Sequence, residues 1–268
     1  MRFHLGDIKG GWAIVTGATS DVGREYAHTL GRAGLNLLLV ARREAELQAL
    51  ASEIEAQSGL CAVPLALDLT ATGAATQVLQ ALQAQRGARL RLLFSYTGVG
   101  RPAAHEAAHR DRYSATIDLN VAAVVSLTTT LLPALQASAP SAVVHVSSQA
   151  AYQPVPYLAV YAASKAFVHH FSLALHEELR EHGVLVQTLV PAPTDAELDA
   201  RAGASAGAGV QRGSAADVVR ASIDGLNRGA AVATNASGIW KQRLFAGLAP
   251  PAMVVREVAK MFKPPAQG

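Results

Sequence analysis

The stretch WAIVTGATSDVG, residues 12–23, joins an apolar run to a turn of small residues. The run Trp12–Thr16 is typical of a strand that is buried on both faces. Small residues in the turn let the backbone approach a pyrophosphate, and the N-terminus of the helix that follows attracts its charge. The stretch therefore predicts a phosphate-binding turn, the alternative being an ordinary strand–helix turn. The residues expected to contact the phosphates are Gly17, Thr19, Ser20, Val22 and Gly23.

Apolar runs alternate with helical patterns along the rest of the chain. Continuous apolar strands and strand–helix alternation are typical of right-handed βαβ units in a parallel sheet. We expect an α/β fold in one domain over residues 1–268, a doubly wound, mainly parallel seven-stranded sheet with helices on both faces. The expected strands are 12–16, 37–41, 62–67, 90–95, 142–146, 184–190 and 231–234, and the expected helices include 23–33, 44–57, 74–85, 113–136 and 157–182.

Composition narrows the class of protein. Half of the 268 residues are apolar, 16% are charged, and the net charge of +3 comes without a Lys/Arg run, so no nucleic-acid partner is expected. The apolar stretch Leu35–Ala41, which Asn36 interrupts, is far too short to span a bilayer. The first residues lack a hydrophobic signal core, so we expect a soluble, cytoplasmic protein for which a membrane partner is unlikely. Cys61 is the one cysteine, so an intrachain disulfide is excluded and a metal site built on thiolates is not expected. We expect Cys61 to be a small residue of the core, and we expect no metal site in the protein.

The second expected strand ends at Ala41 and is followed by Arg42 and Arg43. An acidic residue near this position holds the ribose hydroxyls of NAD, whereas an arginine accommodates the 2′-phosphate of NADP. No acid precedes Glu44, so this pattern predicts NADP(H) as the cofactor, with Arg42 at its phosphate. The alternative is two solvated arginines at a helix start.

Tyr161 and Lys165 lie four residues apart in a helical pattern and so share one face. A nearby lysine cation stabilises a phenolate and lowers the pKa of a tyrosine, which can then exchange a proton with a carbonyl or an alcohol. A Tyr-x-x-x-Lys pair alone is common, but here Ser148 precedes Tyr161 by thirteen residues and Asn120 precedes Ser148 by twenty-eight.

With these spacings, the sequence resembles the short-chain dehydrogenase/reductase family in its single-domain form, a Rossmann-type fold. The matching stretches are TGATSDVG, ALDL, IDLNV, VHVSS, YAASK and PAPTD, from about Trp12 to Asp195. The phrases TGATSDVGREYA and LLVARREAELQALASEIE look closest to the branch of long-chain 3-oxoacyl-CoA and 17β-hydroxysteroid reductases.

The resemblance implies roles for individual residues. Tyr161 would be the general acid/base, Lys165 would assist it and hold the nicotinamide ribose, Ser148 would bond the substrate oxygen, and Asn120 would anchor a water. Asp68 would contact adenine and Thr194 the carboxamide. The remaining cofactor positions are Leu69, Thr97, Gly98 and Pro191.

Three departures from the family pattern put cofactor affinity and substrate geometry in doubt. Asp21 stands where a second turn glycine is usual, Ser95-Tyr96-Thr97 where Asn-Asn-Ala is usual, and Ala192 where glycine follows Pro191. Asp21 would bring a negative charge near the phosphates, although a carboxylate can also cap a helix.

Two C-terminal segments have alternative interpretations. Residues 199–213 read DARAGASAGAGVQRG, a composition that favours a mobile loop, either a substrate lid or a plain surface loop. A helical tail is expected near 237–262, where Trp240 and Phe245 either line a hydrophobic substrate pocket or simply pack. Its basic and apolar residues suit a membrane surface, but packing on the domain or a partner subunit is the better interpretation.

Among the histidines within the expected strands and helices, three are candidate functional residues. His145 is expected to be a hydrogen-bonded core residue, and His169 and His170 to face different sides rather than bind a metal.

The pattern as a whole predicts an NADPH-dependent oxidoreductase that reduces a hydrophobic ketone or aldehyde. Two alternatives stay open: an NADP-dependent alcohol dehydrogenase working in the oxidative direction, and a cofactor-binding regulatory or scaffold protein with weak catalysis. The long apolar helices 113–136 and 157–182 predict a homodimer or homotetramer.

Overall fold

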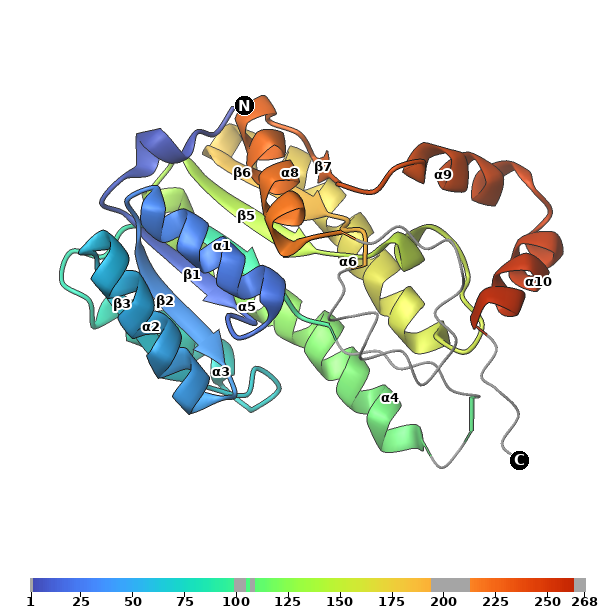
Figure 1. Ribbon diagram of the computed structural model, residues 1–268, viewed down its shortest axis with the longest axis horizontal. Coiled ribbons are helices and arrows are strands. Elements are labelled where there is room, and N and C mark those ends of the chain that lie inside the picture. The colour runs from blue at the N-terminus through green and yellow to red at the C-terminus, as the bar shows by residue number, and fades with distance from the viewer. Residues whose placement is uncertain (1, 99–104, 107–108, 194–212, 263–268) are drawn as a thin grey trace.

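A computed structural model describes residues 2–98, 105–106, 109–193 and 213–262, and its centre is a parallel sheet. Seven strands lie in the order β3-β2-β1-β4-β5-β6-β7, and every neighbouring pair is parallel. The predicted sheet is therefore confirmed (Figure 1). The strands are β1 Trp12–Thr16, β2 Asn36–Ala41, β3 Ala62–Ala66, β4 Leu90–Ser95, β5 Ser141–Val146, β6 Val184–Leu189 and β7 Val232–Ala233.

Helices cover both faces of this sheet, as a doubly wound fold requires. One buried cluster joins the sheet to α1 (Asp21–Arg32), α2 (Glu44–Ser58) and α8 (Ala215–Arg228). A second cluster joins the opposite face to α3 (Ala74–Gln83), α5 (Ala123–Ala137) and α6 (Ala159–Glu178). Every residue of β1, β4, β5 and β6 is buried, which accounts for their mostly apolar sequences. Polar exceptions such as Arg91, His145 and Gln187 are hydrogen-bonded.

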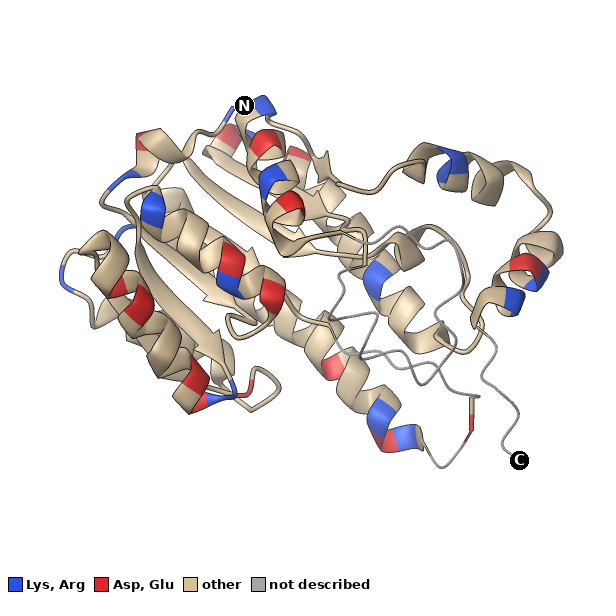
Figure 2. Ribbon diagram, viewed as in Figure 1, with Lys and Arg blue, Asp and Glu red and all other residues tan. Residues whose placement is uncertain are grey.

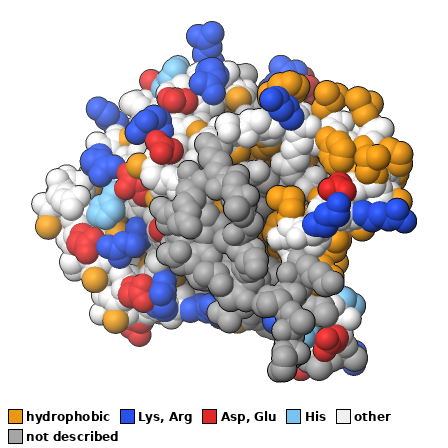
Figure 3. All heavy atoms as spheres, turned by 45° about the vertical axis from the view of Figure 1, so that its right-hand side comes forward, with side chains coloured by type: hydrophobic (Ala, Val, Ile, Leu, Met, Phe, Trp, Pro, Cys, Tyr) orange, Lys and Arg blue, Asp and Glu red, His pale blue; other side chains and the backbone are white. Residues whose placement is uncertain are grey.

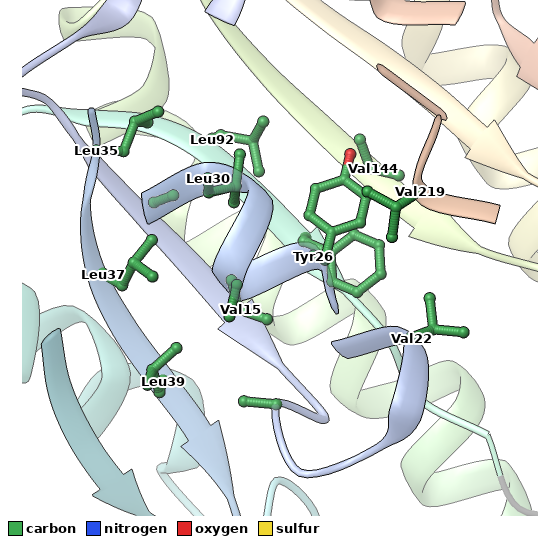
Figure 4. Close-up of a cluster of buried hydrophobic side chains, with 14 of the residues drawn as sticks. Val15, Val22, Tyr26, Leu30, Leu35, Leu37, Leu39, Leu92, Val144 and Val219 are labelled. Atoms are coloured by element: carbon green, nitrogen blue, oxygen red, sulfur yellow. The ribbon is translucent and has the colours of Figure 1, made fainter. Parts of the chain in front are cut away.

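Tyr26 occupies the middle of the first cluster, between α1 and the sheet (Figure 4). Its ring stacks on Phe94 with ring centres 3.8 Å apart, and its hydroxyl lies 2.9 Å from that of Ser222 on α8. These contacts join α1 and α8 in one packed core.

The expected helix 113–136 is interrupted in the structure. It consists of α4 (Arg110–Ile117), a π-helical turn (Asp118–Ala122) and α5. Such a π-turn inserts one residue into the helical repeat and is frequent at functional sites. Hydrophobic periodicity does not report a single inserted residue, so the sequence predicts only one continuous helix.

The C-terminal segment forms two helices, α9 (Ile239–Leu248) and α10 (Pro251–Phe262). Val254 and Val258 of α10 are buried in a third cluster that includes Leu158 and Tyr161. The tail is expected to pack on its own domain or on a partner subunit, and α10 packs on its own domain, whereas α9 buries no residue.

One expectation about the core is wrong. Cys61 is exposed, because it precedes β3, the edge strand, where only alternate residues face the core.

Candidate functional site

The strand order reverses between β1 and β4, so the connections that leave these strands diverge and open a crevice at their carboxyl ends. A cavity of about 350 Å³ lies there. Of the residues predicted to bind the cofactor, eight line this cavity: Gly17, Thr19, Ser20, Arg42, Asp68, Leu69, Thr97 and Gly98. Val22, Gly23, Tyr161, Lys165 and Pro191 are not in its wall, although Lys165 donates to the carbonyl of Thr97, which is.

Two glycines of the first turn have no room for a side chain. Gly17 has a φ of +62°, and a Cβ there would lie 2.6 Å from the carbonyl oxygen of Tyr96. A Cβ on Gly23 would lie 2.2 Å from the carbonyl oxygen of Gly17. Glycine at both positions lets the turn close tightly against α1, which leaves the N-terminus of that helix beside the cavity.

Ser20 and Asp21 shape that N-terminus. Ser20 caps α1: its hydroxyl donates to the carbonyl of Gly17 at 2.7 Å and accepts the Gly23 N–H at 3.0 Å. The Asp21 carboxylate accepts the Val22 N–H at 2.8 Å. Asp21 is thus the first residue of α1, inside the Ser20 cap, and its carboxylate occupies an N–H of Val22, one of the residues expected at the phosphates. Its negative charge stays at the N-terminus of the helix.

The two arginines after β2 differ in their contacts. Arg43 donates to the carbonyl of Thr19 at 2.7 Å and pairs with Glu46 at 3.0 Å, so it braces the turn. Both arginines line the cavity, and Arg42 lies there beside Asp68. The backbone and hydroxyl of Thr70 donate to Asp68 and lower the pKa of its carboxyl, and the positive charge of Arg42 adds a smaller contribution.

Lys165 is buried between the two functional regions, 2% exposed. Its ammonium donates to the carbonyls of Thr97, after β4, and of Val146, at the end of β5, the latter at 2.9 Å. The same nitrogen lies 5.8 Å from the centre of the Tyr161 ring, one turn earlier on α6. A Cβ on Gly98 would lie 3.3 Å from it, so a small residue there keeps the lysine beside the cofactor cavity.

A second cavity, also of about 350 Å³, brings Ser148 and Tyr161 together. Ser148 follows β5 and begins a short 3₁₀ turn, Gln149–Tyr152, where its hydroxyl accepts the Ala150 N–H at 3.2 Å. The other walls come from Pro191 after β6 and from α9 and α10, including Phe245. Of the two aromatic residues considered for a substrate pocket, Phe245 lines the cavity and Trp240 is exposed.

Asn120 lies in the π-turn and is completely buried. Its amide donates to the Ser164 hydroxyl at 3.0 Å, and that hydroxyl donates to the carbonyl of Tyr161 at 2.7 Å. The amide oxygen of Asn120 is buried without a hydrogen-bond partner among the described residues. A buried acceptor of this kind is an appropriate site for an ordered water.

Sequence reasoning missed two serines that position this group. Ser147 donates to the main-chain carbonyl of Lys165 at 2.8 Å, and Ser164 links Asn120 to Tyr161. Both stand inside the motifs VHVSS and YAASK, and a serine within a buried helix must find a partner, which is the signal that could have identified Ser164.

His145 and His169 are buried in the core, whereas His170 is exposed, so His169 and His170 face different sides as predicted. His145 lies 2.9 Å from both the Thr128 and Ser172 hydroxyls, and burial lowers its pKa to about 3. Burial also lowers the pKa of His169 to about 4. Among the described residues, no group of three metal-ligating side chains is found.

Some predicted features lie outside the described residues: Thr194, and residues 199–212 of the loop considered as a lid. Ala192 is described and fully buried, with its N–H donating to Asn235 at 2.8 Å.

Comparisons with known proteins agree with this geometry. The short chain dehydrogenase family model matches residues 11–206. The very-long-chain 3-oxoacyl-CoA reductase of Coprinopsis cinerea is 35% identical over 69% of this chain, and the mouse 17-beta-hydroxysteroid dehydrogenase type 3 is 32% identical over 68%. The chain spans only 55% and 59% of these two relatives.

A solved structure supports the same assignment over nearly the whole chain. The short-chain dehydrogenase from Sphingobium yanoikuyae, in complex with NADPH, has a TM-score of 0.76 and 27% identity, covering 96% of this chain and 98% of that one. Because the family model covers strands β1 to β6, the glycine turn and the Asn120, Ser148, Tyr161 and Lys165 positions, the chain belongs to the short-chain dehydrogenase family.

Proposed function

We propose that the protein is an NADPH-dependent oxidoreductase that reduces a ketone or aldehyde to an alcohol, with Asn120, Ser148, Tyr161 and Lys165 as its catalytic group. One observation carries this proposal: Ser148 and Tyr161 line one cavity, and Lys165 lies between Tyr161 and the wall of the neighbouring cofactor cavity.

The residues of the first cavity fit a dinucleotide. Gly17 and Gly23 allow the backbone to approach a pyrophosphate at the N-terminus of α1, and Arg42 lies where a 2′-phosphate would need a cation. When bound, NADPH supplies the hydride. The NADPH-bound relative from Sphingobium yanoikuyae supports this choice of cofactor.

Tyr161 supplies the proton in this proposal. Its side chain is 9% exposed and faces the cavity shared with Ser148, so its hydroxyl can reach a substrate oxygen held there. The Lys165 ammonium stabilises the phenolate that remains, because a cation in a low-dielectric site acts strongly over this distance. The Ser148 hydroxyl donates to the substrate oxygen and orients the carbonyl.

Asn120 helps to return a proton to Tyr161 after each turnover. Ser164 fixes the Asn120 amide, so its buried oxygen remains as an acceptor for a water that relays protons toward Lys165. The π-turn places Asn120 at this point of the helix.

The substrate cavity is mostly apolar, with walls from Val155, Leu158, Phe245, Val258 and Phe262. This lining supports a hydrophobic carbonyl substrate, as do the names of the relatives. The reductive direction rests on the preference for NADP(H), and the oxidative direction remains the enzymatic alternative.

A cofactor-binding scaffold with weak catalysis is the second candidate function. The observation that favours it concerns Asp21, whose carboxylate accepts the Val22 N–H at the N-terminus of α1 and brings a negative charge to the place where the phosphates would bind. The assembled catalytic group favours the enzyme.

The test is NADPH oxidation by the purified full chain with a panel of cyclic, aromatic and long-chain ketones, followed by the reverse assay with the corresponding alcohols. Turnover of at least one ketone supports the reductase. Tight NADPH binding without turnover of any substrate in either direction would favour the scaffold.

We also propose that the chain forms a homodimer or homotetramer in the cytoplasm through residues 113–136 and 157–182. Phe167 on α6 is 41% exposed, and such a large apolar side chain suits an interface. Sedimentation should show an oligomer that Phe167→Glu weakens; a native monomer at micromolar concentration would contradict the proposal.

A further inference from the structure

The described part of α9 and α10 carries an unusual set of exposed apolar side chains. Trp240, Leu244, Leu248 and Met253 are exposed by 62%, 53%, 77% and 50%. Three of them recur every four residues along α9 and therefore share one face of the helix. Figure 3 shows hydrophobic side chains gathered over these two helices. A contiguous exposed patch of large apolar residues marks an interaction surface.

The inner side of α9 is held to the catalytic region, so this outer face is presented in a defined direction. Gln242 donates to the carbonyl of Gln149 at 3.2 Å, and the Arg243 guanidinium lies 5.1 Å from the centre of the Tyr152 ring. Gln149 and Tyr152 belong to the turn that follows Ser148.

Basic residues surround the apolar face. Residues 239–262 contain four bases against one acid, Glu257. Arg243 lies against Tyr152 on the inner side, and Lys260 pairs with Glu257 at 2.7 Å. The exposed Lys241 and Arg256 therefore supply the net positive charge beside the apolar face. Figure 2 shows this excess of blue over red on α9 and α10. Apolar residues flanked by bases, with a tryptophan among them, are what an interfacial helix presents to an anionic bilayer.

The charge also argues against a second copy of this chain as the occupant. A symmetric dimer places the same patch against itself, which would bring Lys241 and Arg256 of one copy toward the same bases of the other. An anionic surface instead complements them. The patch also adjoins the substrate cavity, because Phe245 and Met261 are exposed by 40% and 53% and also line that cavity.

We propose that the outer face of α9 and the adjoining residues of α10 bind the surface of an anionic lipid bilayer, with the mouth of the substrate cavity at the membrane. The apolar side chains enter the boundary between headgroups and acyl chains, and the bases remain at the headgroups. A stretch long and apolar enough to cross a membrane also exists among the described residues, Arg110–Ala137, of whose most apolar window 39% is buried. It carries the fully buried Asn120, and its α5 part packs on β4 and β5. The proposal therefore concerns surface binding.

The test is co-sedimentation of the full chain with vesicles of phosphatidylcholine alone and of phosphatidylcholine mixed with phosphatidylglycerol, without cofactor or substrate. We expect binding to the anionic vesicles that high salt weakens. The double variant Leu244→Glu/Leu248→Glu should lower the bound fraction at least about tenfold, because it puts charges into the apolar boundary. Gln77→Glu/Gln80→Glu, at two exposed glutamines on α3, adds the same two charges outside the patch; it is the matched control and should bind as the native chain does.

A second pair of variants tests the charge separately. Lys241→Gln/Arg256→Gln should weaken binding to anionic vesicles about tenfold or more, whereas Arg86→Gln/Arg89→Gln, two exposed bases after α3, should not. Equal binding to both vesicle types would overturn the proposal. A loss of binding in the control variants as large as the loss in the variants of the patch would also overturn it. So would a native oligomer that Leu244→Glu/Leu248→Glu dissociates in the absence of vesicles, which would assign the patch to a second copy. Turnover of a water-soluble ketone is measured separately, so failure of the proposed reductase activity cannot be mistaken for failure of this surface.

Discussion

The ammonium of Lys165 lies 5.8 Å from the centre of the Tyr161 ring and also donates to the backbone carbonyls of Thr97 and Val146. These carbonyls lie at the ends of β4 and β5, so the lysine ties α6 to the sheet at the point where the two cavities meet. Removing its charge would leave two buried carbonyls without this donor and Tyr161 without its neighbouring cation. Lys165 therefore holds α6 against the sheet and also supplies the cation beside Tyr161.

Arg42→Ala should weaken NADPH binding by about tenfold or more and change NADH binding little, because a charged hydrogen bond to phosphate contributes roughly 1.5–3 kcal/mol. The measurement is the dissociation constant of each cofactor by fluorescence titration. Arg24→Ala is the control, since Arg24 pairs with Glu53 at 2.9 Å and does not line the cofactor cavity. Tighter binding of NADH than NADPH by the native chain would contradict the assignment of Arg42.

Asp21→Gly should tighten NADPH binding several-fold. The carboxylate accepts the Val22 N–H and brings a negative charge to the N-terminus of α1, where the cofactor phosphates must approach. Asp21→Asn separates the two effects, because it removes the charge and keeps the side chain. Isothermal titration gives the affinities. Weaker NADPH binding by both variants would show that Asp21 supports the cofactor site instead of opposing it.

Stability should fall as the pH is lowered from 7.5 to 5, in part because of His145. Its pKa in the folded chain is about 3, below the ordinary value of 6.5, so the unfolded chain binds the extra proton as the pH falls. The lost stability is about 2 kcal/mol at pH 5. Urea unfolding at both pH values measures it.

His145→Gln should reduce this pH-dependent loss even if it lowers stability at both pH values. His169, whose pKa is also lowered by burial, continues to contribute in that variant. His182→Gln, at an exposed histidine, is the control and should keep the native difference. An unchanged difference in His145→Gln would mean that His145 is not buried in its neutral form.

The sheet and the cofactor cavity could be predicted from sequence because both depend on local patterns. Apolar runs such as Trp12–Thr16 reflect burial on both faces, and the turn between Gly17 and Gly23 depends on contacts within one connection. The packing of α10 against Tyr161 could not be predicted, because it joins segments about a hundred residues apart through ordinary valines.

The site also contains features that no local pattern reports. The π-turn at Asn120 differs from a regular helix by one residue, and the bond from Ser147 to the Lys165 carbonyl requires the arrangement of β5 and α6. The prediction that Cys61 lies in the core is wrong, because its apolar neighbours do not show that β3 lies at the edge of the sheet.

The central claim is that Tyr161 donates the proton, and Tyr161→Phe tests it most directly, assayed with NADPH and the best ketone of the panel. The variant removes the hydroxyl and keeps the ring packed against Leu158 and Val258. We expect turnover to fall by about 10²–10⁴-fold with NADPH affinity nearly unchanged, whereas Lys165→Met should weaken both. Retention by Tyr161→Phe of more than about a tenth of the native rate would contradict the account, because positioned acid catalysis contributes far more than tenfold.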